Sequence, residues 1–160
     1  MWQTAMLENP FLKNLTPEQY DLLAGLFVRI ELPPRTYVFQ QGEPATHMYV
    51  LVDGNISIRY KPYDGPRITL THLHCGDVFG WSSVVGNATY TSDALSTTSG
   101  LALRVRGDSL RNLCIQYPGT GTQILEKLAL AVAPRWLDSR RQVERILHRE
   151  MRVESGSPVA

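Results

Sequence analysis

Runs in which apolar residues occupy every second position fill the middle of the chain. A period of two is typical of β-strands that are buried on one face. The runs are marked by Tyr37 and Phe39; by Met48, Val50 and Val52; by Ile56, Ile58 and Tyr60; and by Ile68, Leu70 and His72. One further strand region extends from Ala94 to Val105. Short strands at fairly even intervals predict an antiparallel barrel or roll.

Turn residues separate these runs. Asp53-Gly54 lies between two of them and predicts a tight hairpin, because such a turn needs a positive φ that glycine adopts without strain. The segment Tyr63-Asp64-Gly65-Pro66 predicts a second turn, which leads into the run that begins at Ile68.

Helical patterns flank the predicted barrel. Thr16, Pro17 and Gln19 have the spacing of a capping box with proline at the first helical position, so a helix should run from there to about Leu26. Its apolar residues should pack on the barrel. Asp108 predicts the start of a short helix to Ile115, which Tyr117-Pro118-Gly119 should end. A last helix should run from Thr120–Thr122 to about Met151, with a kink or break at Pro134.

The length and composition fit one compact domain. The chain has 160 residues, of which 43% are hydrophobic, so it can bury a substantial core. We predict a mainly β fold with flanking α-helices, as a single domain over residues 1–152. The barrel should cover about 30–106, the C-terminal helices about 108–151, and a flexible tail 153–160.

Charge and hydropathy give few clues to partners. Sixteen basic and 15 acidic residues leave a net charge of +1, which favours neither nucleic acid nor membrane binding in general. The arginines between Arg135 and Arg152 alternate with acidic residues, as on a solvated helix face. The first residues do not resemble a secretion signal, and the longest apolar run, Leu128–Ala133, is too short to span a bilayer. We therefore expect a soluble, cytoplasmic protein.

The cysteines and histidines allow a metal site but do not favour one. Cys75 and Cys114 fit a reducing compartment and say little about pairing. His72, His74 and Cys75 lie close together in sequence, but a fourth ligand and a spaced second pair are missing. The favoured interpretation is an ordinary strand end.

The segment Gly76–Ser92, GDVFGWSSVVGNATYTS, is the strongest candidate for function. It joins a strand end to a short helical turn and then to another strand. Gly76 and Gly80 permit tight turns, and Ser82 and Ser83 open a turn whose free N–H groups can face a negative charge. Glycines at this spacing are often only turn residues, so the segment predicts a phosphate-binding loop only together with the strands around it.

The order of Gly42, Gly54, the Gly76-Asp77-x-Phe79-Gly80 block and the following strand resembles the cyclic-nucleotide-binding domain family, over about Leu7–Leu147. The resemblance implies a jelly-roll barrel, also called a double-stranded β-helix, and a regulatory role in binding cyclic nucleotides. The family pattern is Phe-Gly-Glu, a variable piece, then Arg-Ser/Thr-Ala. Here Trp81 occupies the position of the glutamate, Tyr90 that of the arginine, and Thr91-Ser92 follow.

Both departures concern the ligand. The resemblance implies that the glutamate would hold the ribose 2′-hydroxyl and that the arginine would contact the cyclic phosphate, and neither role transfers to an indole or a phenol. The candidate binding residues are therefore those of the altered cassette, for a cyclic nucleotide or another small anionic ligand: Gly80, Trp81, Ser82, Ser83, Tyr90, Thr91 and Ser92. Backbone N–H groups and hydroxyls can recover part of the lost affinity, without the missing positive charge.

Two questions about this pocket stay open in the sequence. Arg67 and Arg104 are the nearest arginines along the chain, but either can point outward from its strand. Trp81 and Tyr90 can line an enlarged pocket for a planar ligand, or they can fill it.

The last predicted helix offers a dimer seam. Trp136, Arg140, Val143 and Leu147 share one helical face, although Arg140 interrupts it. In bacterial regulators of the resembling family the matching helix pairs two subunits, so we expect a homodimer. Because only Val153–Ala160 follows, without a helix-turn-helix pattern, we expect no direct contact with nucleic acid.

Two functional classes follow. No nucleophile elbow, paired carboxylates or phosphate-binding P-loop is present, so we expect no enzyme.

The first of the two functional classes is a small-molecule sensor with altered or weakened cyclic AMP or cyclic GMP binding, which signals through its C-terminal helix. The alternative is a degenerate domain with a plugged pocket that serves dimerisation or protein interaction.

Overall fold

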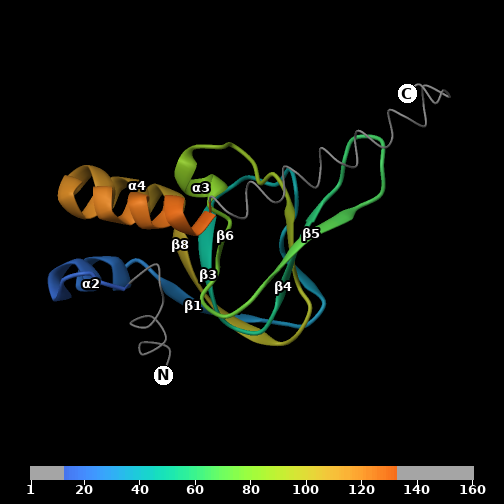
Figure 1. The fold of residues 1–160 in the computed structure, drawn as a ribbon, viewed down its shortest axis with the longest axis horizontal. Helices are drawn as coiled ribbons and strands as arrows, with labels where there is room; N and C mark the ends of the chain where they lie inside the picture. The colour runs from blue at the N-terminus through green and yellow to red at the C-terminus, as the bar shows by residue number, and fades with distance from the viewer. Residues whose placement is uncertain (1–12, 133–160) are drawn as a thin grey trace.

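The computed structural model describes residues 13–132, which form two four-stranded antiparallel sheets with helices on one side (Figure 1). The sheets have the strand orders β1-β8-β3-β6 and β2-β7-β4-β5. In chain order the elements are α2 (Pro17–Ala24), β1 (Val28–Leu32), β2 (Thr36–Phe39), β3 (His47–Asp53), β4 (Ile56–Tyr60), β5 (Ile68–Leu73), β6 (Val78–Phe79), α3 (Ser82–Val85), β7 (Asp93–Ser96), β8 (Gly100–Arg106) and α4 (Gly107–Gln116). Residues 118–132 are helical as well. The predicted mainly β fold with flanking helices is confirmed.

Helix α2 begins where its capping residues predict. Thr16 accepts from the backbone N–H of Gln19 at 3.2 Å, and the Gln19 side chain accepts from the Thr16 N–H at 3.1 Å. Pro17 occupies the first turn, where a missing N–H costs nothing. The helix ends at Ala24, before the predicted Leu26, and Leu23 anchors it in the core.

The core has two parts, separated by the first sheet. Strand β3 contributes to both, because its side chains alternate between the faces of the sheet. Met48 and Val50 pack under the helices, whereas Tyr49 and Leu51 pack between the two sheets. The strand is therefore buried on both faces, and the expectation of a half-buried strand is wrong here. The reason is that the helices cover the face that would otherwise meet water.

The turn at Asp53-Gly54 is a corner between sheets and does not close a hairpin. It joins β3 to β4, which belong to different sheets. Gly54 has a φ of 98°, and a Cβ there would lie 2.9 Å from the Cα of Gly100. The predicted backbone conformation is thus present, but the predicted pairing is corrected. A local turn signal does not reveal which strand lies beside which.

By contrast, the turn over residues 63–66 does close a hairpin, between β4 and β5. A bulge after Ile58 shifts its register. Thr71, opposite Ile58, lines the pocket described below, and Leu73 is fully buried. The inward face of β5 is therefore not the one that carries Ile68, Leu70 and His72.

His72 has a structural partner of its own. Its Nδ1 lies 3.1 Å from the Ser57 hydroxyl, and the thiol of Cys75 donates to the Val52 carbonyl oxygen at 2.8 Å. No group of three potential metal ligands occurs among residues 13–132. Strand β5 ends at Leu73, so His72, His74 and Cys75 lie at a strand end, as predicted.

Pro118 separates two helices, because it follows the end of α4 and begins the next helix. Helix α4 covers the predicted stretch with one extra residue at each end. The next helix begins at Pro118 and not at Thr120–Thr122, because proline fits the first turn of a helix as well as it stops the preceding one. The predicted kink at Pro134 and the seam from Trp136 to Leu147 lie outside the described residues. Within 13–132, no helix is long and apolar enough to cross a membrane.

Candidate functional site

The cassette forms a tight path from β6 through α3 to β7. Gly80 leaves β6 with a φ of 75°, a conformation that side chains other than glycine rarely adopt. A Cβ at this position would lie 2.9 Å from the His47 carbonyl oxygen and 3.2 Å from the rings of Phe39 and Tyr49. Gly80 is thus required both by its backbone conformation and by the space around it.

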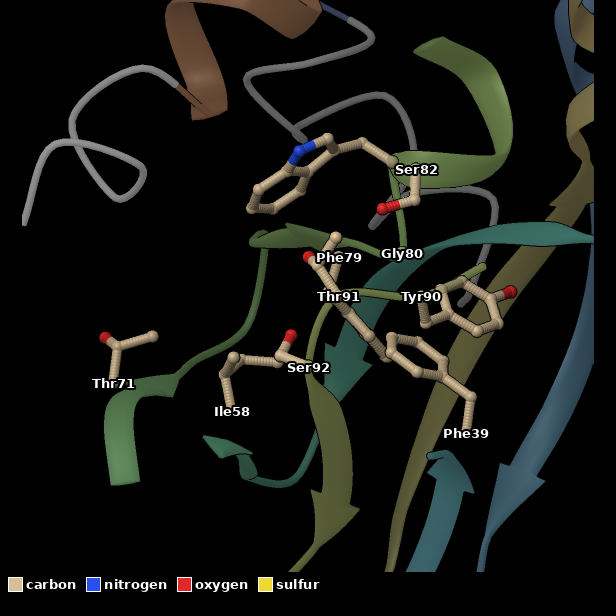
Figure 2. Close-up of a pocket in the computed structure, with 10 residues that line it drawn as sticks. Phe39, Ile58, Thr71, Phe79, Gly80, Ser82, Tyr90, Thr91 and Ser92 are labelled. Atoms are coloured by element: carbon tan, nitrogen blue, oxygen red, sulfur yellow. The ribbon is translucent and has the colours of Figure 1, made fainter. Parts of the chain in front are cut away.

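A pocket opens beside this turn, against the inward face of the second sheet (Figure 2). The interior of the pocket has a volume of about 40 Å³. The volume is about 410 Å³ when the space at the open mouth is included. The smaller volume describes the interior and suits a few water molecules, at about 10–15 Å³ each. A larger ligand must therefore occupy the mouth as well. The lining residues are Phe39, Ile58, Thr71, Phe79, Gly80, Trp81, Ser82, Tyr90, Thr91 and Ser92.

Tyr90 forms one wall of the pocket and is held at both ends. Its ring stacks on Phe39 with a centroid distance of 3.7 Å and an interplanar angle of 13° (Figure 2). Its hydroxyl donates to the His47 carbonyl oxygen at 2.6 Å and accepts from the His47 N–H at 3.0 Å. Only 4% of Tyr90 is exposed. Tyr90 is therefore a fixed part of the core.

The phenols near the pocket stay neutral at ordinary pH. Burial raises the pKa of Tyr90, and the hydrogen bond with the His47 backbone opposes that rise. Burial, with the nearby Tyr90, raises the pKa of Tyr49 to about 12. Tyr49 lies beside Phe79 with a centroid distance of 5.0 Å. The aromatic wall thus carries no charge that could attract or repel a ligand.

Four residues with hydroxyl groups line the pocket, namely Thr71, Ser82, Thr91 and Ser92. None of them makes a side-chain hydrogen bond to another residue within 13–132. In Figure 2, Ser82 lies on the cassette side, and Thr71 lies across the pocket, on β5 of the second sheet. A hydroxyl both donates and accepts, so the lining can hydrogen-bond a neutral polar ligand.

Ser83 does not line the pocket, unlike the other six candidate residues. It is 2% exposed, and its hydroxyl donates to the Gly80 carbonyl oxygen at 3.0 Å. Its own carbonyl accepts from the Arg111 guanidinium, which also pairs with Asp108. Because consecutive residues of a helix are rotated by about 100° about its axis, adjacent serines point in different directions. Ser82 faces the pocket, and Ser83 connects α3 to α4.

Neither Arg67 nor Arg104, the two arginines considered from the sequence, lines the pocket. The Nε of Arg67 lies 2.7 Å from an oxygen of the buried Asp93 carboxylate, although its N–H does not point along that line. The other carboxylate oxygen accepts from the Gln41 N–H at 2.7 Å. Arg104 lies opposite Tyr49 in the strand register. Neither arginine is among the lining residues, so the pocket carries no charged side chain.

Sequence reasoning missed four lining residues, Phe39, Ile58, Phe79 and Thr71. The first three could have been found, because Phe39 and Ile58 lie on the apolar faces of their strands and Phe79 belongs to the cassette block. Thr71 could not, because the bulge after Ile58 decides which face of β5 turns inward.

The two antiparallel sheets form a β-roll. A pocket lies beside the one-turn helix α3, which has a glycine near each end, and this arrangement is that of a ligand-binding domain. The family model described as "cyclic nucleotide-binding domain" matches residues 29–117. The chain belongs to this family, and the resemblance found in the sequence is confirmed.

Among curated proteins, the chain is similar to the CRP-like cAMP-activated global transcriptional regulator of Mycobacterium tuberculosis, with 30% identity over 117 residues. The match covers 73% of this chain and 52% of the regulator, so the chain spans about half the length of that relative.

Two solved structures show the same fold. A cyclic nucleotide-binding domain from Methylobacillus flagellatus has a TM-score of 0.80 and 14% identity, and the match covers 90% of this chain and 83% of that one. The regulatory subunit of a cAMP-independent protein kinase A from Trypanosoma cruzi, bound to guanosine, has a TM-score of 0.72 and 17% identity. There the match covers 90% of this chain and 48% of the subunit.

Proposed function

We propose that this chain is a regulatory, non-catalytic ligand-sensing domain with weakened affinity for cyclic nucleotides. One observation carries the proposal: the hydroxyl of Tyr90, the residue that the sequence pattern assigns to the position of the phosphate-binding arginine, is already bonded to the backbone of His47. A cyclic phosphate placed against the cassette would meet hydroxyls and backbone N–H groups without a cation.

The expected loss of affinity is large. Removing one partner of a buried, hydrogen-bonded charge pair costs about 2–5 kcal/mol, which weakens binding by about 30-fold to several thousand-fold. A site of micromolar affinity would become millimolar. Trp81 at the glutamate position removes the acceptor for the ribose hydroxyl and adds to this loss.

The guanosine-bound trypanosomal subunit supports a ligand other than a cyclic nucleotide, because that protein has the same fold and carries a nucleoside without a phosphate. The mycobacterial regulator supports a role in signalling. We infer that this chain, too, regulates a partner, and that it acts in the cytoplasm as a homodimer through its C-terminal helix.

The contact of α3 with α4 offers a route for the signal. Arg111 of α4 donates to the Ser83 carbonyl in α3, so a ligand that moves the cassette also pulls on α4. Residues 118–132 continue the helical region directly after α4. Signalling through the C-terminal helix is the mechanism that these contacts favour.

A plugged module for dimerisation or protein interaction is the second candidate. The narrow interior of about 40 Å³ and the fully bonded Tyr90 favour it. The two candidates differ in whether any small molecule binds at the mouth of the pocket.

Calorimetric titration with cyclic AMP and cyclic GMP tests the proposal. The unaltered chain should bind them at millimolar concentration or more weakly, and Tyr90→Arg combined with Trp81→Glu should bind more tightly by about tenfold or more. Tyr63→Arg, at a residue that is 98% exposed, is the control for an added arginine. Micromolar binding by the unaltered chain would refute the proposal. A circular-dichroism melt of each variant excludes unfolding as the cause of weak binding.

A further inference from the structure

The chemistry of the pocket lining is the starting point, and this step rests on the function proposed above. Its ten lining residues comprise aromatic and aliphatic side chains, one glycine and four hydroxyl-bearing residues, with no charged group. A ligand that enters the pocket loses the hydration of the groups that contact this lining. An uncharged ligand loses little by that exchange, whereas an anion without a counter-charge loses much of its solvation.

Charges near the pocket also disfavour an anion. Asp93, which directly follows the lining residue Ser92, is 1% exposed. The charge of Arg67 is used by the Asp93 carboxylate. The guanidinium of Arg111 is likewise held by Ser83 and Asp108. Arg67 and Arg111 therefore have partners before any ligand arrives, and Arg59, which lies opposite Asp93 in the strand register, is not among the lining residues.

The aromatic wall favours a flat ring. The rings of Phe39 and Tyr90 lie nearly parallel, as do those of Tyr49 and Phe79, with an interplanar angle of 15°. Phe39, Phe79, Trp81 and Tyr90 all line the pocket. Of these rings only that of Trp81 is partly exposed, since Phe39, Phe79 and Tyr90 are at most 5% exposed, so a planar heterocycle would stack on the indole, irrespective of its charge.

The hydroxyls supply the remaining specificity. Thr71, Ser82, Thr91 and Ser92 each offer a donor and an acceptor that no other residue within 13–132 uses. They lie on both sides of the pocket, so they can meet polar groups around the edge of one ligand (Figure 2). A ring with amide or hydroxyl substituents satisfies them, whereas a plain hydrocarbon would leave them unpaired.

We infer that the pocket binds an uncharged ligand made of a planar heterocycle with hydroxyl or amide groups, of the nucleoside or nucleobase class, and that it discriminates against phosphorylated forms of the same ligand. The site would then distinguish ligands by whether they carry a phosphate, and it would bind those without one more tightly.

Pairs of ligands that differ only in the phosphate provide the test. Adenosine, adenine and cyclic AMP, and likewise guanosine and cyclic GMP, are titrated into the full chain by calorimetry and by ligand-observed NMR. The nucleoside should bind at least about tenfold more tightly than its cyclic phosphate. Its affinity should stay constant between low and high salt, because no ionic contact is screened. Comparison of adenosine with adenine shows whether the sugar contributes.

Variants of the lining link any binding to this pocket. Thr71→Val and Ser92→Ala remove one hydroxyl each without enlarging the side chain. Each should weaken nucleoside or base binding by about three- to tenfold. Thr89→Val is the matched control, because Thr89 belongs to the cassette but is exposed and outside the lining. An equal effect of the control and the lining variants would overturn the assignment of the site.

The outcomes separate this inference from the proposed function. Millimolar binding of cyclic nucleotides without binding of nucleosides or bases overturns the inference and leaves the proposed function intact. Micromolar binding of a cyclic nucleotide, equal to or tighter than that of its nucleoside, overturns both. If none of the five compounds binds at millimolar concentration, the inference fails and the plugged module is favoured.

Discussion

Gly107, the first residue of α4, lies so close to Ser83 of α3 that a Cβ on the glycine would be 2.1 Å from the serine carbonyl oxygen. Atoms of this kind cannot approach to that distance, so only glycine permits the two helices to meet here. Gly107→Ala should push α4 away from the cassette and lower the free energy of unfolding by about 1–3 kcal/mol. Urea denaturation monitored by circular dichroism measures this change.

Gly119→Ala is the control for this prediction. Gly119 lies in the helix that begins at Pro118, and nothing lies within 4 Å of a Cβ built there. Alanine favours a helix over glycine by up to about 1 kcal/mol, so this variant should be neutral or more stable. If the two variants behaved alike, the close contact between Gly107 and Ser83 would not matter for stability.

Tyr90→Phe should destabilise the fold although it keeps the ring. It removes the hydroxyl that bonds both the carbonyl oxygen and the N–H of His47. Part-buried backbone groups then lose a partner, at a cost of about 1–3 kcal/mol. Hydrogen exchange of the His47 amide should become faster, and thermal melting should occur at a lower temperature. Tyr63→Phe, at a fully accessible tyrosine, should change neither measurement.

His47 should make stability depend on pH below neutrality. Burial lowers the pKa of His47 from 6.5, and the positive charges of Arg104 and Arg106 lower it further. Between the lowered pKa and 6.5 the unfolded chain binds more protons than the folded one. Stability contributed at this site is therefore fully present above pH 6.5 and is lost as the pH falls through the lowered value.

Denaturation at several pH values between 7.5 and about 5 measures this dependence. His47→Gln should flatten the pH profile, because a glutamine does not titrate. His74→Gln, at an exposed histidine, is the control for loss of an imidazole. An unchanged profile in His47→Gln would exclude this histidine as the source.

The ion pair of Asp93 with Arg67 should stabilise the fold mainly because the arginine neutralises a buried carboxylate. Arg67→Gln leaves a carboxylate that is 1% exposed without its cation, whereas the arginine is 39% exposed and hydrated. Because water screens the arginine, we expect a loss of about 1–3 kcal/mol, below the value for a fully buried pair. A double-mutant cycle with Asp93→Asn isolates the coupling. A coupling energy near zero would contradict the structural role of the pair.

Local signals in the sequence predicted much of this fold. Thr16 and Gln19 located the start of α2, and the turn over residues 63–66 identified the β4–β5 hairpin. These features depend on residues a few positions apart, for which backbone preferences decide the outcome. The cassette was recognisable for the same reason, since Gly80 and Ser82 are neighbours.

Long-range pairing was not predictable in this way. The conformation of Gly54 follows from its own residue type, but its place between two sheets follows from Gly100, across the chain. Tyr90 was identified as a departure from the family pattern, yet its partner is the backbone of His47, and a backbone group leaves no mark in a sequence. The same holds for the Arg67 contact with Asp93, which a turn and a separate strand bring together.

Strand β3 separates the two parts of the core and is packed on both faces, and this limits which substitutions the pocket can accept. Tyr49 supports the aromatic stack while its neighbour Met48 supports the helices, on the same rigid pleat. A substitution that reshapes one compartment must leave the other in place, because one strand of seven residues lines both. During evolution, new ligand preferences should therefore arise at Thr71, Trp81 and Ser92, along the rim, sooner than within this strand.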